Sequence, residues 1–331
     1  MDGTTDRPGP GSAPGPDPGS GPGSGPGRVV VGVDGSPSAD AAAVWAAREA
    51  DLRHTGLVIV HATDTRALYL PQAETERIQQ AGRELLDRTA RAAEARHPGL
   101  SVVTEIDEGA APAALRAAAG PTGTIVVGHR GLGGFSSLVL GSVGLELAAA
   151  ATAPVVVIRG ADEPAEPPGP SEPDVVLAAV RDANDAGCAR EAAREALLRK
   201  VPLRLFHVWK AVPYLRGKAA ARNGAEGQGV GEHVRALTGI AASLREEFPD
   251  LTVDTQGERG PSVPGALVEA SRHAVLLVVG GRRAPGYLGP TLGRTTLGLL
   301  QHAHCPVELI PRHGAGTGPG TGTGHGHGST S

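Results

Sequence analysis

The chain has 331 residues, of which 40% are hydrophobic, only 2% aromatic and 20% charged, with a formal net charge of −4 at pH 7. This length favours about two domains, and the interspersed acids and bases argue against nucleic-acid binding, which needs a basic face. The sequence contains no apolar run near 18 residues, the approximate length that a membrane-spanning helix requires, so no membrane segment is expected.

Three segments of biased composition divide the chain. Residues 1–27 consist almost entirely of Gly, Pro, Ser, Thr and Asp. They cannot bury enough apolar surface to offset the entropy of ordering, so we expect a disordered tail, and they lack the pattern of a signal peptide. Residues 160–173 predict a Pro-rich acidic linker, and residues 313–331 a second disordered tail rich in Gly and His.

The first remaining segment, 28–159, alternates short apolar runs with helical patterns such as residues 73–92. Strands are expected over 28–34, 57–62, 100–106, 123–128 and 154–158. Strands that alternate with helices indicate βαβ units and a parallel sheet. Right-handed crossovers then predict a doubly wound, three-layer α/β/α domain with a five-stranded parallel sheet.

The fourth expected strand runs into a glycine-rich loop with the spacing Gly128-x2-Gly131-x9-Gly141-Ser142, and a helical pattern follows over 143–151. Glycines let the backbone approach an anion closely and adopt positive φ. The N–H groups of such a loop and of the following helix suit phosphate. No Gly-Lys-Ser/Thr follows, so this is not a Walker A loop. The alternative is a loop that only turns the chain.

The second segment, 174–312, repeats the first in the same order, which indicates a tandem duplication. Matching pairs are 28–34 with 174–180, 46–50 with 192–196, 124–128 with 276–280, and 153–158 with 305–310. The chain is therefore expected to contain two domains of one design.

The glycine loop, together with residues 31–36 and 60–64, resembles the universal stress protein family, and the resemblance covers the whole first domain. It implies a five-stranded parallel sheet with four helices and, in the nucleotide-binding branch, ATP, with or without Mg²⁺, across the carboxyl ends of the strands. On this resemblance the adenosine would meet Gly32, Val33 and Asp34, the adenine Ala62, and the ribose and phosphates Val127, Gly128, Arg130, Gly131, Gly141, Ser142 and Val143.

Each polar residue in this set has a plainer alternative role. Asp34 would serve as a turn residue, with Ser36 or Ser38 capping the next helix. Ser142 would cap the helix that follows the loop. Arg130 is a strong phosphate donor, but an exposed loop arginine is usually only solvated. These alternatives stay open at the level of sequence.

His61 and His207 recur at the same strand end in the two halves, which favours a shared packing role over catalysis. No carboxylate pair, Ser-His-Asp order or metal-ligand spacing stands beside them, so neither catalytic nor metal-binding residues are predicted. Cys188 and Cys305 fall on unrelated elements. The simplest expectation is a reduced, cytoplasmic protein without disulfides.

The second domain carries a damaged copy of the loop. Arg283 stands where the first domain has Gly131, and Arg294 where it has Ser142. Val180 replaces Asp34 in the ungapped match, and Arg181 replaces it after a one-residue slip. A Cβ at position 283 would obstruct a left-handed backbone or close phosphate approach. We therefore expect no ATP binding in the family manner here; another anion, or a role as packing partner, stays open.

The last strands of the two domains, 155–158 and 307–310, are largely apolar and would lie at sheet edges, which invite pairing. Family domains commonly dimerise along this strand, so we expect an intramolecular pseudo-dimer, with a further homodimer left open.

These features favour a cytoplasmic ATP-binding protein with a sensory or regulatory role in stress, acting through an unknown protein partner. A slow ATP-hydrolysing enzyme and a ligand-free interaction module remain as alternatives. Hydrolysis needs a placed metal and a group that positions water, and Asp34 would sit near the adenosine rather than the γ-phosphate.

Overall fold

The computed structural model describes residues 27–65, 69–132, 140–159, 174–210, 223–280 and 292–311. The expected tails, 1–27 and 313–331, and the expected linker, 160–173, lie outside these ranges apart from Gly27. Among the helices so described, none combines the length and the apolar character needed to span a bilayer.

The first domain contains all the expected strands in a parallel sheet of order β3-β2-β1-β4-β5. Its elements are β1 (Val29–Gly32), α1 (Pro37–Leu52), β2 (Leu57–Ala62), α2 (Gln72–Arg96), β3 (Val102–Asp107), α3 (Ala111–Ala119), β4 (Thr124–Gly128), α4 (Ser142–Ala149) and β5 (Val155–Ile158). The first strand ends earlier than expected, because the carboxylate of Asp34 turns back to the N–H of Ser36.

The second domain follows the same path, and its parallel strands take the order β10-β9-β6-β7-β8. Its elements are β6 (Val175–Ala179), η2 (Ala183–Asp185), α5 (Ala186–Arg199), β7 (Leu203–Lys210), α6 (Asn223–Glu247), β8 (Val253–Gly260), α7 (Val263–Ala270), η3 (Ser271–His273), β9 (Ala274–Gly280), α8 (Arg294–His302) and β10 (Val307–Ile310). The expected α/β class and tandem arrangement are confirmed.

Helices cover both faces of each sheet. In the first domain α1 and α2 pack on one face and α3 and α4 on the other. The alanine-rich side of α1 lies close to the strands because alanine side chains are short. Ser36 caps this helix by accepting the N–H of Ala39 at 3.2 Å, and Pro37 follows at the first helical position, where its fixed φ suits a helix start.

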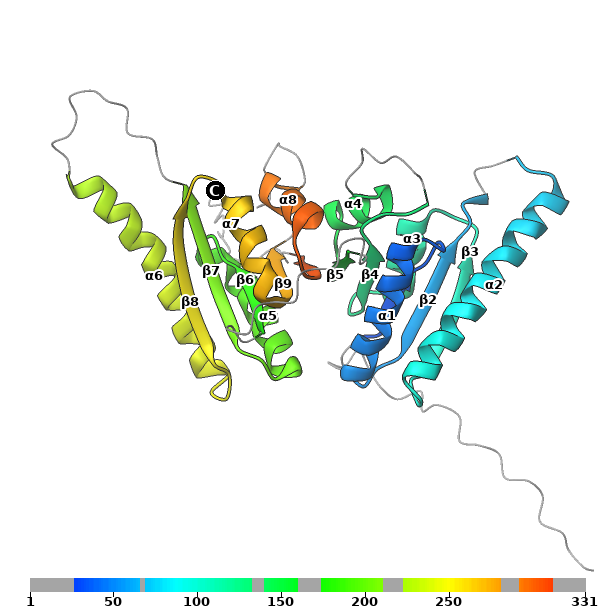
Figure 1. Ribbon diagram of the computed structural model, residues 1–331, viewed down its shortest axis with the longest axis horizontal. Coiled ribbons are helices and arrows are strands. Elements are labelled where there is room, and N and C mark those ends of the chain that lie inside the picture. Colours follow the sequence, from blue (N-terminus) through cyan, green and yellow to red (C-terminus); the bar gives the residue numbers. More distant parts are fainter. Residues whose placement is uncertain are drawn as a thin grey trace, which may run out of the picture.

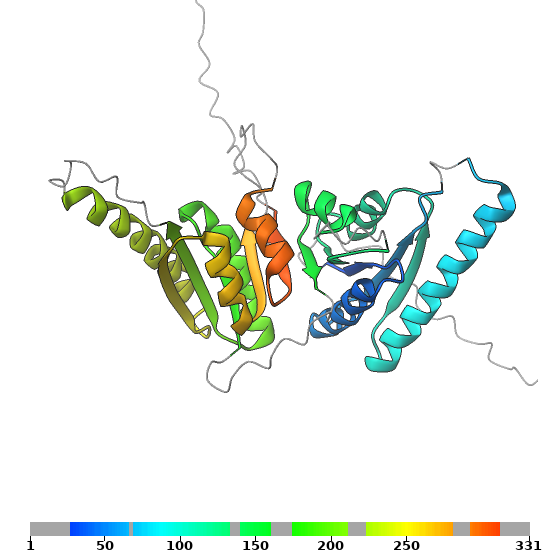
Figure 2. The ribbon, with the colours of Figure 1, turned by 45° about the horizontal axis from the view of Figure 1, so that its top comes forward.

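The two sheets join into one sheet of ten strands. The edge strands β5 and β10 pair antiparallel, with Val156 opposite Glu308 at the centre of the register. Figure 1 shows the two domains side by side, with β5 near the middle and the long helices α2 and α6 at the outer ends. In Figure 2 the orange end of the second domain again lies beside the green end of the first. A hydrophobic cluster runs continuously across this seam on the side of α4 and α8.

Candidate functional site

A cavity of about 710 Å³ opens at the carboxyl ends of β1, β2 and β4 in the first domain. Its volume lies in the range of about 300–1,000 Å³ that is usual for ligand sites. β1 lies between β2 and β4, where the strand order reverses, and open α/β sheets bind ligands at that point. The lining includes every site residue expected from the sequence: Gly32, Val33, Asp34, Ala62, Val127, Gly128, Arg130, Gly131, Gly141, Ser142 and Val143.

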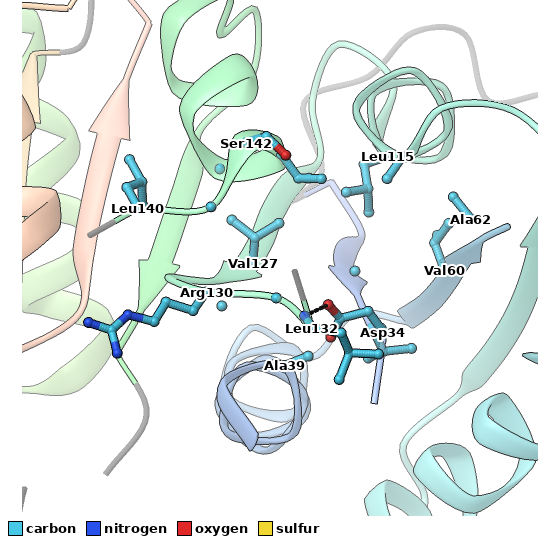
Figure 3. Close-up of a pocket in the computed structure, with 18 residues that line it drawn as sticks. Asp34, Ala39, Val60, Ala62, Leu115, Val127, Arg130, Leu132, Leu140 and Ser142 are labelled. Atoms are coloured by element: carbon cyan, nitrogen blue, oxygen red, sulfur yellow. Dashed lines mark hydrogen bonds between the residues drawn. The ribbon is translucent and has the colours of Figure 1, made fainter. Parts of the chain in front are cut away.

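The lining also includes residues that the sequence did not single out. They are Ala39, Val60, Ala111, Leu115, Leu132, Leu140 and Gly144. Figure 3 shows Val60, Ala62 and Leu115 gathered at one end of the cavity. Ala111 and Leu115 lie one turn apart at the start of α3, and their i, i+4 spacing after β3 was the signal available in the sequence. This apolar end suits a flat, weakly polar ring.

The beginning of α4 forms the polar end. Gly141 is the N-cap and has no side chain that could cap the helix. Its own N–H donates to the carbonyl of His129 at 2.7 Å. The first helical hydrogen bond joins the N–H of Leu145 to the carbonyl of Gly141. The N–H groups of the three preceding residues, starting with Ser142, therefore have no partner within the helix and favour an anion. Ser142 is the first helical residue rather than the cap.

Asp34 ties the loop to the end of β1. Its Oδ1 accepts the N–H of Ser36 at 3.0 Å, and its Oδ2 accepts the N–H of Leu132 at 3.0 Å. Figure 3 shows the second of these bonds at the rim of the cavity. The turn role considered for Asp34 is therefore present, and the same carboxylate also lines the cavity.

Arg130 is tied to the start of α1 through its backbone, and not through its side chain. The hydroxyl of Ser38 donates to the carbonyl of Arg130 at 2.5 Å and accepts its N–H at 3.1 Å. The side chain is exposed, and in Figure 3 the guanidinium points away from Asp34 and Ser142. The exposed side chain agrees with the solvated alternative.

Two of the loop glycines, Gly128 and Gly131, stand where an added side chain would make close contacts. A Cβ at Gly128 would lie 2.6 Å from the backbone carbon of Ser38, so β4 and α1 leave no room for a side chain. A Cβ at Gly131 would lie 2.6 Å from Oδ2 of Asp34. The expectation of positive φ is wrong for Gly128, Gly131 and Gly141; the glycine beside this site with φ in that region is Gly35, at 84°.

Within the described ranges, no three His, Cys, Asp or Glu side chains come together as a metal site. Cys188 and Cys305 are both buried free thiols. Burial raises the pKa of Cys305 to about 12, so this thiol stays protonated.

Comparison with known proteins fits this geometry. The model of the universal stress protein family matches residues 26–159 and again 174–311. The chain belongs to the universal stress protein family. A universal stress protein of Mycolicibacterium smegmatis is 31% identical over 296 residues, which cover 85% of this chain and 96% of that protein. One from Mycobacterium tuberculosis H37Rv is 30% identical over 292 residues, covering 84% and 94%.

Solved structures support the fold. A universal stress protein from Archaeoglobus fulgidus aligns with a TM-score of 0.63 at 16% identity, covering 86% of this chain and 96% of that chain. Both domains are therefore universal stress protein folds.

One hydrogen bond is repeated in the two universal stress domains and shows which of their residues are equivalent. Nδ1 of His61 lies 2.7 Å from the carbonyl oxygen of Val33, and Nδ1 of His207 lies 2.7 Å from that of Val180. This pairing supports the packing role expected for the two histidines. It also makes Val180 the counterpart of Val33, so Arg181 takes the place of Asp34, which corrects the ungapped match.

The second universal stress domain has larger side chains where the first has its cavity. By the same equivalence Ala179 replaces Gly32, Phe206 replaces Val60 and Val208 replaces Ala62. Phe206 is 1% exposed and packs in the core with Val208. The positions that form the apolar end of the first-domain cavity thus carry larger side chains in the second domain.

The polar end of the second domain differs as well. Arg181 turns back onto Asp185, with Nη2 3.0 Å from Oδ1. Arg294 begins α8, where the first domain has Ser142. Arg283 lies outside the described residues.

Proposed function

We propose that the first domain binds an adenine nucleotide, ATP with or without Mg²⁺, in the cavity at the ends of β1, β2 and β4. The observation that carries the proposal is the division of this cavity. Val60, Ala62 and Leu115 supply an apolar end for a base, while the N–H groups at the start of α4, which make no bond within the helix, supply an anion site for phosphates. Asp34 also lines the cavity and offers carboxylate oxygens to a ribose hydroxyl.

We infer a sensory or regulatory role in the stress response, in the cytoplasm, for this nucleotide-binding protein. A ligand in the cavity would touch β1, β2, α3, β4 and α4 at once. It would therefore favour the conformations in which these elements are docked together, and a ligand shifts such a balance by its differential affinity. An unidentified protein partner would recognise the surface that these docked elements form. The carboxylate of Asp34 accepts hydrogen bonds from two backbone N–H groups. This fixed carboxylate suits a role in positioning the ligand.

The second domain is proposed to support the first rather than to bind a second ATP. Ala179, Phe206 and Val208 are larger than the residues at the equivalent positions of the first domain, so they would leave less room for a base, and Arg181 replaces the acid.

Isothermal titration of the full-length protein with ATP and Mg²⁺ tests this proposal. We expect saturable binding with about one site per chain, because the second domain carries larger side chains at the positions that would surround a base. Two equal sites would contradict the assignment of the second domain, and no binding heat at several temperatures would contradict the proposed function. Titration with GTP is the matched control for base recognition.

A further inference from the structure

Four charged side chains close a ring across the seam between the two domains. Arg53 of α1 donates from Nε to Oε1 of Glu49 at 2.7 Å and from Nη2 to Oε1 of Glu195 at 2.7 Å. Arg199 of α5 donates from Nη2 to Oε2 of Glu49 at 2.7 Å and from Nη1 to Oε2 of Glu195. Each acid thus meets both bases. Their side chains are between 4% and 16% exposed, so the ring is largely withdrawn from water.

The duplication places these residues at equivalent positions. Glu49 and Glu195 belong to the repeated segments 46–50 and 192–196, and each arginine follows its glutamate by one helical turn. α1 and α5 therefore present the same pair of charges to each other. The ring is electrically balanced, with two positive and two negative groups.

A fifth ionisable group, Glu308, lies near this cluster and interacts with all four of its charges. Glu308 of β10 is 2% exposed, and its main chain stands opposite Val156 of β5 at the centre of the seam. Ile310 packs into the core beneath α5, and residues two apart in a strand share a face, so Glu308 points to the same side as the ring. Within the described part of the chain, Oε2 of Glu308 has no hydrogen-bond partner.

Burial raises the pKa of Glu308 well above its ordinary value. The carboxylates of Glu195 and Glu49 raise it as well, while the guanidinium groups of Arg53 and Arg199 lower it. These four side chains are the charged groups that face Glu308 from α1 and α5. Burial alone would lower the pKa of Arg53, but Glu195 and Glu49 raise it above its ordinary value, so its guanidinium stays charged.

We propose that Glu308 makes the contact between the two domains depend on pH, with the seam tight while its carboxyl is neutral and looser once it ionises. A neutral carboxyl leaves the ring balanced. An ionised one adds a third buried negative charge beside two positive groups, and an uncompensated buried charge is strongly unfavourable. The opposite side of the seam is a continuous hydrophobic cluster, and its buried thiol, Cys305, has a pKa raised to about 12 and stays protonated near neutral pH, so the change acts on the side of α1 and α5.

The raised pKa of Glu308 decides whether the protein gains or loses stability as the pH rises. The folded protein holds the proton of Glu308 more tightly than the unfolded chain does. The stabilisation is therefore complete below the ordinary glutamate pKa, about 4.3, and is lost as the pH rises through the raised pKa. Between these two values the folding equilibrium constant falls by up to about tenfold per pH unit.

Urea unfolding of the full-length protein between about pH 5 and pH 9 tests the proposal when wild type is compared with Glu308→Gln. The amide has the shape of the acid and cannot ionise. The ratio of the two folding constants should change by up to about tenfold per pH unit in favour of the variant, and level off above the raised pKa. If Glu308→Gln does not fold, Glu308→Val, which copies Val156 of β5, takes its place.

A second measurement, amide hydrogen exchange, reports on the seam separately from the rest of the molecule. Amide hydrogen exchange in residues 155–158 and 307–310, corrected for its intrinsic pH dependence, should accelerate with rising pH in wild type and not in the variant. Glu146→Gln, at a surface acid whose side chain is 58% exposed, is the matched control and should follow wild type. Parallel stability curves for wild type and Glu308→Gln, or diverging curves without faster exchange at the seam, would overturn the proposal.

Discussion

Replacing Gly131 with arginine should weaken ATP binding about tenfold or more, equivalent to about 1.4 kcal/mol. The reason is steric: a Cβ at this position lies 2.6 Å from Oδ2 of Asp34, so either this carboxylate or the loop must shift, and the bond between Asp34 and the N–H of Leu132 is disturbed. The rest of the side chain would then occupy the space of the phosphates. The substitution copies Arg283 of the second domain into the open site. Calorimetry with ATP and Mg²⁺ measures the effect.

The matched control is Gly239→Arg. Gly239 is exposed on α6, and a Cβ there would meet nothing within 4 Å. This variant should bind ATP as wild type does, and both variants should keep the wild-type circular dichroism. Unchanged affinity in Gly131→Arg would mean that this loop does not hold the phosphates. An equal loss in both variants would point to a general effect of the added charge.

Replacing Arg199 with methionine should lower the free energy of unfolding by about 3–5 kcal/mol, the usual effect of removing one partner from a buried charge pair. The change leaves Glu49 and Glu195, whose side chains are 4% and 9% exposed, to share Arg53 alone. Methionine keeps the length and the apolar stem of the arginine, so lost packing contributes little. Chemical denaturation of the full-length protein gives the difference.

Arg190→Met on the same helix provides the comparison. Arg190 is 43% exposed and lies 2.7 Å from Glu247 in an ordinary surface pair. Such pairs contribute about 0–1 kcal/mol, so this variant should be nearly as stable as wild type. If the two variants lose the same small amount, the ring at the seam does not stabilise the fold in the way described.

The architecture was predictable because apolar runs and helical patterns alternate clearly in both halves. The carboxyl ends of parallel strands meet at one edge of a sheet, so the end of β1, Ala62 at the end of β2 and the loop after β4 come together wherever such a fold forms. The site residues taken from the family resemblance therefore fall on one cavity. The apolar wall from α3 was missed because Ala111 and Leu115 read as ordinary core positions.

Other features depend on distances that a sequence does not contain. The ungapped repeat aligned Val180 with Asp34, and only the hydrogen bonds of His61 and His207 show that Arg181 holds that place. The same equivalence places Phe206 where the first domain has Val60 at its cavity. The repeated Glu and Arg positions of α1 and α5 were visible in the sequence, but their closure into a ring requires the two helices to meet across the seam.

Whether the first-domain cavity holds an adenine nucleotide is decided by mass spectrometry of the ligand released when gently purified, full-length protein is denatured. We expect ATP at about one equivalent per chain, and much less from Gly131→Arg purified in the same way. Wild-type protein that carries no nucleotide, and that still carries none after incubation with ATP and Mg²⁺ and removal of the excess, would contradict the assignment.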